Sequence, residues 1–333
     1  MNNKGRKIAI LLTAVGGILL VWLVKSLFLE SYRIASGQME NTLLEGDRLW
    51  VNKCAYGIRL PQAWLALPFL HDSIPGTRLR SYDTATSLPY RRLDERSPRH
   101  NDVVAFNVPQ PSSDNIPIDR LPIAIARCIA LPGDTVVSRD GMLFINGIPV
   151  EQPDTRLESY LSASPEIENI LQTVGIENRS VALQPGIRLH FLEHGEHTRL
   201  KSILPGDTLL QPVRLSRDEY TIVLPRPHEK YAVTPENAGW ICDLLNRYEG
   251  TYALCRNGRI YLEGREIFHY TPSQPYYWVI CDNRSAHSDS RTFGVLPHTH
   301  LIGKAVGIGI SIDPGKRFPK SIRFSRLFQS DGL

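Results

Sequence analysis

Short runs of alternating hydrophobic and polar residues fill most of the chain, and this pattern predicts strands rather than long helices. Residues 48–52 alternate as a half-buried strand does, and residues 101–109 have a similar strand-like composition. Residues 123–131 are almost continuously apolar and lead into Pro-Gly-Asp, which is typical of a strand buried on both faces. Further strands are expected at 276–281 and 302–312. The pattern therefore predicts a mainly β protein.

Turn signals between short β-branched runs predict two hairpins. Asp140-Gly141 separates residues 135–138 from 142–145, and Asn257-Gly258 separates residues 252–256 from 259–263. Such Asp-Gly and Asn-Gly pairs favour the two-residue turns of β-hairpins.

Apolar residues recur at helical spacing in two places. A short helix is expected within residues 162–174, and another at 236–248. Between the predicted strands, these are the regions where the β pattern is interrupted.

The N-terminal part of the chain carries one long hydrophobic run. Residues 8–24 are uncharged, and the run extends to Leu29 if Lys25 reaches the membrane interface. Small residues typical of a signal-peptide cleavage site do not follow it. Basic residues precede it, which favours a cytoplasmic N-terminus. We therefore expect a cytoplasmic segment at 1–7, a single transmembrane helix at 8–29, and the bulk of the chain outside the membrane.

Composition excludes some classes of partner and leaves others open. The 333 residues are 42% hydrophobic and 22% charged, as in ordinary globular proteins. The 38 basic and 34 acidic residues are spread along the chain, so no basic stripe indicates nucleic-acid binding. Five cysteines show no CxxC pair or zinc spacing, which leaves one or two disulfides possible.

Residues 190–197 contain three histidines and two glutamates, which raises the question of a metal site. Their spacing, H-x3-H-x2-H, is not a standard ligand pattern, and Gly195 would break a helical register. We interpret the segment as a solvated polar loop and expect neither a metal nor a cofactor. Metal binding or assembly through this loop remains an alternative.

Four blocks, taken together and in order, resemble the bacterial type I signal peptidases, membrane-anchored proteases with a Ser–Lys dyad. They are the apolar span with residues 36–47, then 52–57, 127–134 and 282–291. The sequence segments at 56–61, 102–107 and 311–313 are most similar to the versions of this family found in Bacteroidetes.

The resemblance implies a fold, a location and partners. It implies a β body at 30–144 and 266–333, with a variable β-rich region inserted at 145–265. It also implies an inner-membrane protein whose body lies on the lipid surface in the periplasm. A groove would take signal peptides of exported preproteins in extended form.

The family's catalytic positions are substituted in this chain. Gln38 stands where the family has its nucleophilic serine, and Ala126 where it has the lysine base. A carboxamide forms no acyl intermediate and a methyl group carries no proton. His287 replaces the serine that orients the lysine, and Cys281 replaces a glycine.

The supporting positions are retained. Ser36 stands where the family's serine assists the oxyanion hole, Arg127 follows the base position, and Asp289 and Arg291 brace the last block. The remaining matches are structural positions of the family: Gly37, Met39, Thr42, Leu43, Gly46, Asp47, Pro132, Gly133, Asp134, Asp282, Asn283 and Arg284.

Two hypotheses follow from these substitutions. In the first, the protein has lost proteolysis and binds signal peptides or preproteins, or associates with an active paralogue. In the second, Ser36, His287 and Asp289 form a rewired triad. On an extended segment, Ser36 lies about 7 Å from the position of Gln38. It would have to attack the same peptide bond from there, which makes the second hypothesis less favourable.

Overall fold

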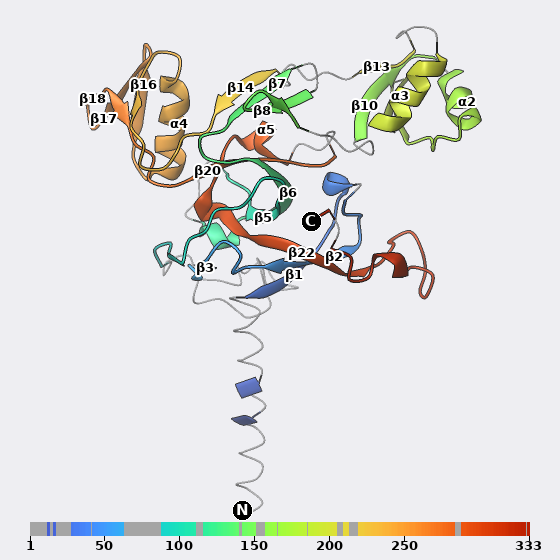
Figure 1. Cartoon of the computed structure of the whole chain (residues 1–333), viewed down its shortest axis with the longest axis horizontal. Helices are drawn as coiled ribbons and strands as arrows, with labels where there is room; N and C mark the ends of the chain where they lie inside the picture. The colour runs from blue at the N-terminus through green and yellow to red at the C-terminus, as the bar shows by residue number, and fades with distance from the viewer. Residues whose placement is uncertain are drawn as a thin grey trace, which may run out of the picture.

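The computed structural model describes residues 12–13, 16–17, 28–40, 42–62, 88–110, 116–139, 142–150, 157–164, 166–184, 186–204, 209–212, 219–283, 288–330 and 332–333. Strands dominate these residues, so the mainly β prediction is confirmed (Figure 1). The largest sheet consists, in spatial order, of β1 (Leu29–Arg33), β2 (Asp47–Asn52), β22 (Leu301–Ser311), β5 (Val103–Asn107), β6 (Ile123–Ala130), β20 (Tyr276–Ile280) and β21 (Leu296–Pro297).

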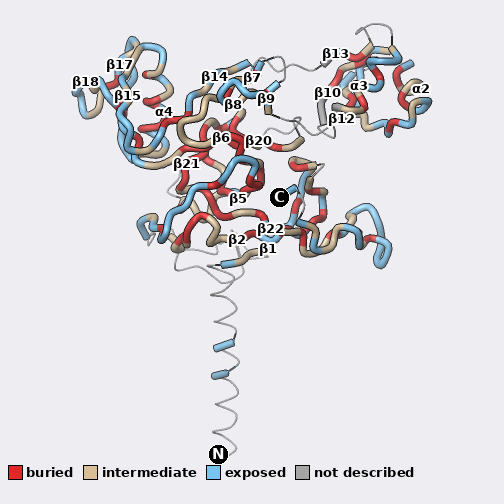
Figure 2. The backbone as a smooth tube through the Cα atoms, in the orientation of Figure 1, coloured by how far each residue is buried: buried red, intermediate tan, exposed pale blue. Residues whose placement is uncertain are grey.

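Every neighbouring pair in this sheet is antiparallel. Strands β5 and β20 are buried at all positions, and β6 is buried at most, which explains their nearly continuous apolar sequences. Strand β2 buries Asp47, Leu49 and Val51 and turns the alternate residues outward. All of the strands expected in the body are therefore present, and the core lies against this sheet (Figure 2).

Glycines in β22 allow close approach from β2. A Cβ on Gly309 would lie 1.9 Å from the indole nitrogen of Trp50, and one on Gly303 would lie 2.3 Å from the Asn52 carbonyl oxygen. Both distances are far below contact. At Gly303 the obstacle is backbone, so only glycine fits, whereas at Gly309 the Trp50 side chain would have to shift. The glycine-rich sequence at 302–312 is thus a consequence of packing across the sheet.

Three smaller sheets of three or four strands each are built between β6 and β20 in the described part of the chain (Figure 1). One consists of β14 (Tyr220–Val223), β7 (Thr135–Arg139), β8 (Met142–Ile145) and β9 (Ile148–Pro149). The second has β11 (Ser180–Gln184), β12 (Ile187–Glu193), β10 (Leu157–Ser162) and β13 (Gln211–Pro212). The third has β16 (Ala253–Arg256), β17 (Arg259–Leu262) and β18 (Arg265–Ile267).

Short elements complete the described fold. Two-stranded ladders join β3 (Ile58–Arg59) to β4 (Arg92–Leu93), and β15 (Tyr231–Ala232) to β19 (His269–Tyr270). The α-helices are α2 (Glu166–Thr173), α3 (His194–Ile203), α4 (Ala238–Tyr248) and α5 (Ser290–Phe293). The 3-10 helices are η1 (Gly37–Met39), η2 (Ile118–Arg120), η3 (His298–His300) and η4 (Phe324–Arg326).

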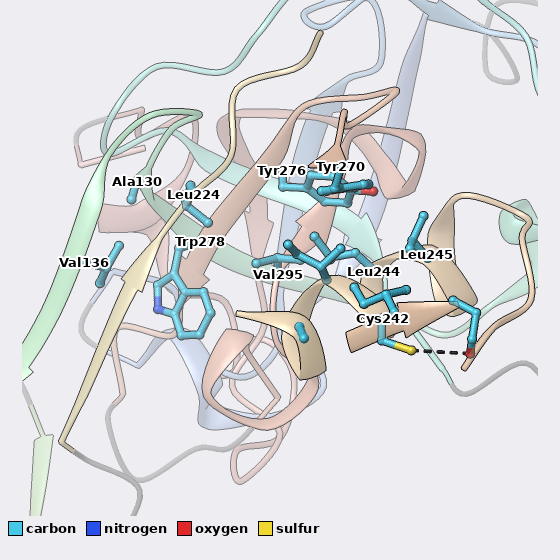
Figure 3. Close-up of a cluster of buried hydrophobic side chains, with 14 of the residues drawn as sticks. Ala130, Val136, Leu224, Cys242, Leu244, Leu245, Tyr270, Tyr276, Trp278 and Val295 are labelled. Carbon is cyan, nitrogen blue, oxygen red and sulfur yellow. Dashed lines mark hydrogen bonds between the residues drawn. The ribbon is translucent and has the colours of Figure 1, made fainter. Parts of the chain in front are cut away.

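Both predicted hairpins and both predicted helices are confirmed. Strand β7 pairs with β8, and β16 with β17. Asn257 and Gly258 have φ of 50° and 72°, the left-handed values that a type I′ turn requires. Helices α2 and α4 fall within the expected segments. Helix α4 joins an apolar cluster with β20, shown in Figure 3 by Leu244, Tyr276 and Trp278.

The expected transmembrane helix at 8–29 falls almost entirely outside the described residues. No helix in the described part of the chain is long and apolar enough to cross a membrane. Its expected last residue, Leu29, instead begins β1 and pairs with Asn52. The expected end of the helix at residue 29 was wrong, because Leu29 is part of a strand that pairs with β2.

Candidate functional site

The segments around residues 38 and 282 meet although they lie far apart in the sequence. Helix η1 begins after Ser36, whose backbone is extended, and it is anchored by Met39, which is 1% exposed. The Asn283 backbone amide donates to the Gln38 carbonyl oxygen at 3.0 Å. Its side-chain amide donates to the Gly37 carbonyl oxygen at 2.9 Å. The two segments are thus joined through their main chains.

Gln38 uses its side chain in the same junction. Its Nε2 donates a hydrogen bond to Ser288 Oγ at 2.8 Å. Ser288 is a site residue that the sequence did not single out, because nothing in the local pattern around 288 indicates a partner 250 residues away. The position at which the resemblance leads us to expect the nucleophile is therefore occupied by a hydrogen-bonded amide.

Asp282 is held by three donors. Arg127 donates from Nε to Oδ1 at 2.9 Å and from Nη2 to Oδ2 at 2.7 Å. Thr42 Oγ1 donates to Oδ2 at 2.6 Å. A two-point guanidinium–carboxylate contact fixes direction as well as charge. Arg127 thus joins β6 to the segment that contains Thr42 and to the segment that contains Asp282.

Arg127 also reaches beyond Asp282. It donates from Nη1 to the Asn101 carbonyl oxygen at 3.0 Å and from Nη2 to the Gly332 carbonyl oxygen at 3.1 Å. The C-terminal residues consequently lie beside the site, as the marked C-terminus in Figure 1 indicates. This contact was also missed from the sequence.

Ala126 lies in β6 opposite Val104 and is 0% exposed. It belongs to an apolar cluster that includes Val104, Cys128, Val279 and Cys281. Burial also raises the pKa of the Cys281 thiol, which keeps that group neutral. The position at which the resemblance leads us to expect the base therefore carries a methyl group in an apolar environment.

Asp289 and Arg291 form a buried pair beside the site. Asp289 is 0% exposed, and its carboxylate accepts from the Cys281 backbone amide at 2.9 Å and from Arg291 Nη2 at 2.8 Å. Arg291 donates further bonds from Nε and its backbone amide. Burial lowers the pKa of Arg291, but the bonds and charge of Asp289 outweigh this and raise it. Both Asp289 oxygens are thus engaged in bracing the loop.

The other retained positions lie around this junction or farther along the scaffold. Asp47 is 0% exposed and accepts from Arg326 Nη2 at 2.7 Å, while the adjacent Gly46 has φ of 90°. Asp134 accepts from the Leu131 backbone amide at 2.8 Å and follows Gly133, with φ of 94°, and Pro132. These residues shape turns and do not touch Gln38 through any hydrogen bond among the described residues.

Two predicted site residues, Arg284 and His287, lie outside the described residues. Ser36 is exposed and precedes η1 without a side-chain cap bond. The expectation that Ser36 and Gln38 share an extended segment was wrong, because Gln38 lies in a 3-10 helix.

The segment 190–197 is not the solvated loop expected from its composition. His190 lies in β12 opposite Tyr160 and is 0% exposed, and Gly195 lies inside α3. Helix α3 starts there because Glu193 and Glu196 form a reciprocal capping box. His197 stacks on Tyr160 with ring centroids 4.3 Å apart. Among the described residues, no group of three His, Cys, Asp or Glu side chains could hold a metal ion.

The five cysteines are all present as thiols. Cys128, Cys242 and Cys281 are buried, Cys54 is partly buried, and Cys255 is exposed. Among the described residues, no hydrogen bond joins any of these thiols to Gln38.

Known proteins resemble this chain in sequence. Residues 7–188 match the family model described as Signal peptidase, peptidase S26. Signal peptidase I of Helicobacter pylori (strain J99 / ATCC 700824) is 24% identical over 96% of this chain and 91% of its own length. Signal peptidase I of Haemophilus influenzae is 23% identical over 92% of this chain and 71% of its own length. Because the family model matches more than half of the sequence, this chain belongs to the signal peptidase S26 family.

Proposed function

We propose that this protein binds signal peptides or exported preproteins without cleaving them. The observation that carries the proposal is the environment of the two dyad positions. Gln38 is a hydrogen-bonded carboxamide, and Ala126 is a buried methyl group among apolar side chains. Covalent catalysis needs a nucleophile and a base within hydrogen-bond reach of each other. Neither group is supplied at these positions.

The surrounding framework supports a retained binding role. Arg127, Asp282 and Thr42 form a connected network that holds β6 against the two loop segments. This network is not needed for catalysis if the dyad is absent. A peptide-binding groove, however, still needs its walls held in place. Association with an active paralogue is the related role in which the same groove would present a preprotein to a second enzyme.

A rewired protease is the competing function. It would use Ser36, His287 and Asp289, with Asp289 orienting the histidine. The Asp289 carboxylate is completely buried, and both oxygens already accept bonds from Arg291 and backbone amides. That engagement disfavours the triad, because an orienting carboxylate must have an oxygen available to the histidine.

The proposed location and domain division follow the family. We infer a single membrane span that begins at residue 8 and ends before β1, a cytoplasmic N-terminus, and a body at 29–144 and 266–333 outside the inner membrane. Residues 145–265 form the proposed insertion, which is supported by the sheet of β10, β11, β12 and β13 that lies entirely within it. The sheet of β7, β8, β9 and β14 spans its first boundary. The sequence phrases at 56–61 and 102–107 further support a Bacteroidetes-like version of the family.

One assay separates these functions. Full-length protein in lipid vesicles is incubated with a preprotein, and binding and processing are followed together. We expect saturable binding without a cleaved product. Cleavage that disappears in Ser36→Ala would overturn the proposal and favour the rewired protease. Arg96→Ala is a suitable control because that side chain forms an exposed ion pair away from Gln38.

A further inference from the structure

Two of the five cysteines lie in one small lobe, where α4 packs against β16 and β17. Cys242 is on the inner side of α4 and is 6% exposed. Its thiol donates a hydrogen bond to the Ala253 carbonyl oxygen in β16 at 3.3 Å (Figure 3). The Cys242 sulfur therefore touches the strand that contains Cys255.

Strand geometry places Cys255 on the face that α4 covers. Residues two apart in a strand point to the same side, so Cys255 shares a side with Ala253. Residues paired across two strands also share a face, and Cys255 pairs with Ile260. Ala253 and Ile260 are 3% and 0% exposed and belong to the same apolar cluster as Cys242. Both thiols consequently border the contact between α4 and the sheet.

The strand residue that the Cys242 sulfur contacts, Ala253, lies two positions from Cys255, which is about 6.6 Å along the strand. A disulfide requires the Cα atoms of the two cysteines themselves to lie roughly 4.4–6.8 Å apart. The two thiols are also close enough to interact electrostatically: burial first, and then the charge of Cys255, raises the pKa of Cys242. Cys255 is exposed, so an external oxidant can reach its thiol.

We propose that Cys242 and Cys255 form a disulfide that fastens α4 to β16 in an oxidising compartment. The pairing depends on the geometry above, whereas the oxidising surroundings rest on the proposed location outside the inner membrane. The remaining cysteines are Cys54, which is partly buried, and Cys128 and Cys281, which are buried in a different cluster.

The reaction is a thiol–disulfide exchange with an external disulfide, either glutathione disulfide or a protein oxidant. The exposed Cys255 thiolate attacks one sulfur of the oxidant, and a mixed disulfide forms as one oxidant thiolate leaves. The Cys242 thiolate then attacks the Cys255 sulfur and displaces the second oxidant thiolate. Two protein thiols are oxidised to one disulfide, the oxidant is reduced to two thiols, and the two protons pass to the departing thiolates.

The test uses purified, folded, fully reduced full-length protein incubated with glutathione disulfide. The sample is quenched in acid, unfolded, and blocked with iodoacetamide. It is then reduced and labelled with N-ethylmaleimide before peptide mass spectrometry. We expect the maleimide on Cys242 and Cys255 and the acetamide on the other three cysteines. Without the reduction step, one cross-linked peptide pair should appear at a mass two hydrogens below the sum of its parts.

Matched variants make the result specific. Cys255→Ser should leave Cys242 fully blocked by iodoacetamide, whereas Cys54→Ser should keep the link. Reduction should lower the melting temperature of the wild type and of Cys54→Ser by roughly a few degrees and leave that of Cys255→Ser unchanged.

Two outcomes would overturn the pairing: a glutathione adduct on Cys255 that never resolves, or a link from either cysteine to another partner. Because the oxidant is added in vitro, the assay does not depend on where the protein is located. A second sample, isolated from cells with thiols blocked at lysis, reports on the compartment. A link formed in vitro but absent from that sample would contradict the proposed location and leave the pairing supported.

Discussion

Gln38 donates a side-chain hydrogen bond to Ser288 at 2.8 Å across 250 residues of sequence. The bond lies beside two others from Asn283 to the main chain of residues 37 and 38. Together they close the junction between η1 and the 282–289 segment. Gln38 thus has a structural partner, and a substitution at this position changes the geometry of the junction as well as its chemistry.

Restoring the dyad should restore cleavage if the groove has been preserved. We expect the double variant Gln38→Ser with Ala126→Lys to process a preprotein. Ala126 is 0% exposed, so desolvation would lower the pKa of a lysine amine placed there and favour its neutral, basic form. The product is measured by gel shift and N-terminal sequencing.

The control for this gain of function is Gln38→Ser with Ala126→Met, which has a side chain of similar length but no amine. It should fold and remain inactive. If the lysine variant is folded by circular dichroism and still cleaves nothing, the groove does not have the geometry of an active peptidase.

The Asp282 network should contribute substantially to stability. Asp282→Ala removes the partner of Arg127, whose side chain is only 20% exposed, and the charge left behind is poorly solvated. We expect a loss of about 3 kcal/mol in the free energy of unfolding, measured with urea. In the matched change Asp94→Ala, the ion pair is 63% and 69% exposed, and the loss should be below about 1 kcal/mol. Equal losses in the two variants would refute a structural role for the network.

The turn before β2 should tolerate no side chain. Gly46 has φ of 90°, and a Cβ there would lie 1.8 Å from the Ile312 carbonyl oxygen. Gly147 has φ of 81°, but nothing lies within 4 Å of its added Cβ. Gly147→Ala should therefore cost about 1 kcal/mol from backbone strain alone. Gly46→Ala should cost about 3 kcal/mol or more because backbone must also move. Thermal melts of the two variants make the comparison.

Two buried histidines should make the protein less stable in mild acid. Burial, followed by the charge of Arg92, lowers the pKa of His298 to about 3. Burial, followed by the charge of Arg59, lowers the pKa of His300 to about 3. The unfolded chain protonates these residues near pH 6.5, and the folded chain does not. Stability should therefore be complete above about pH 7 and fall as the pH drops toward 3.

Each of these histidines contributes up to about 1.4 kcal/mol per pH unit below its unfolded pKa. Urea unfolding between about pH 5.5 and 7.5 measures the slope. His300→Gln should reduce it by about one histidine's share, whereas the exposed His269→Gln should not. A slope unchanged by His300→Gln would show that its burial is not coupled to folding.

Much of the fold could be predicted because its signals are local. The Asn257-Gly258 pair fixes its own turn through left-handed backbone angles, and the apolar run at 123–131 has few alternatives to a buried strand. The prediction for the segment 190–197 was wrong because one tertiary contact and one helix cap outweigh its polar composition. Pairing with β10 buries His190, and Glu193 with Glu196 starts a helix across Gly195.

The sequence by itself determined the similarity to the family's blocks, the mainly β class and the identities of Gln38 and Ala126, because residue identity alone decides whether a side chain can supply a proton or a nucleophile. Only the tertiary structure decided that Gln38 bonds Ser288, that both Asp289 oxygens are engaged by Arg291 and the Cys281 backbone amide, and that Cys255 faces the side of α4. These relationships join residues distant in the chain. Their partners are set by strand register and packing, which no local pattern records.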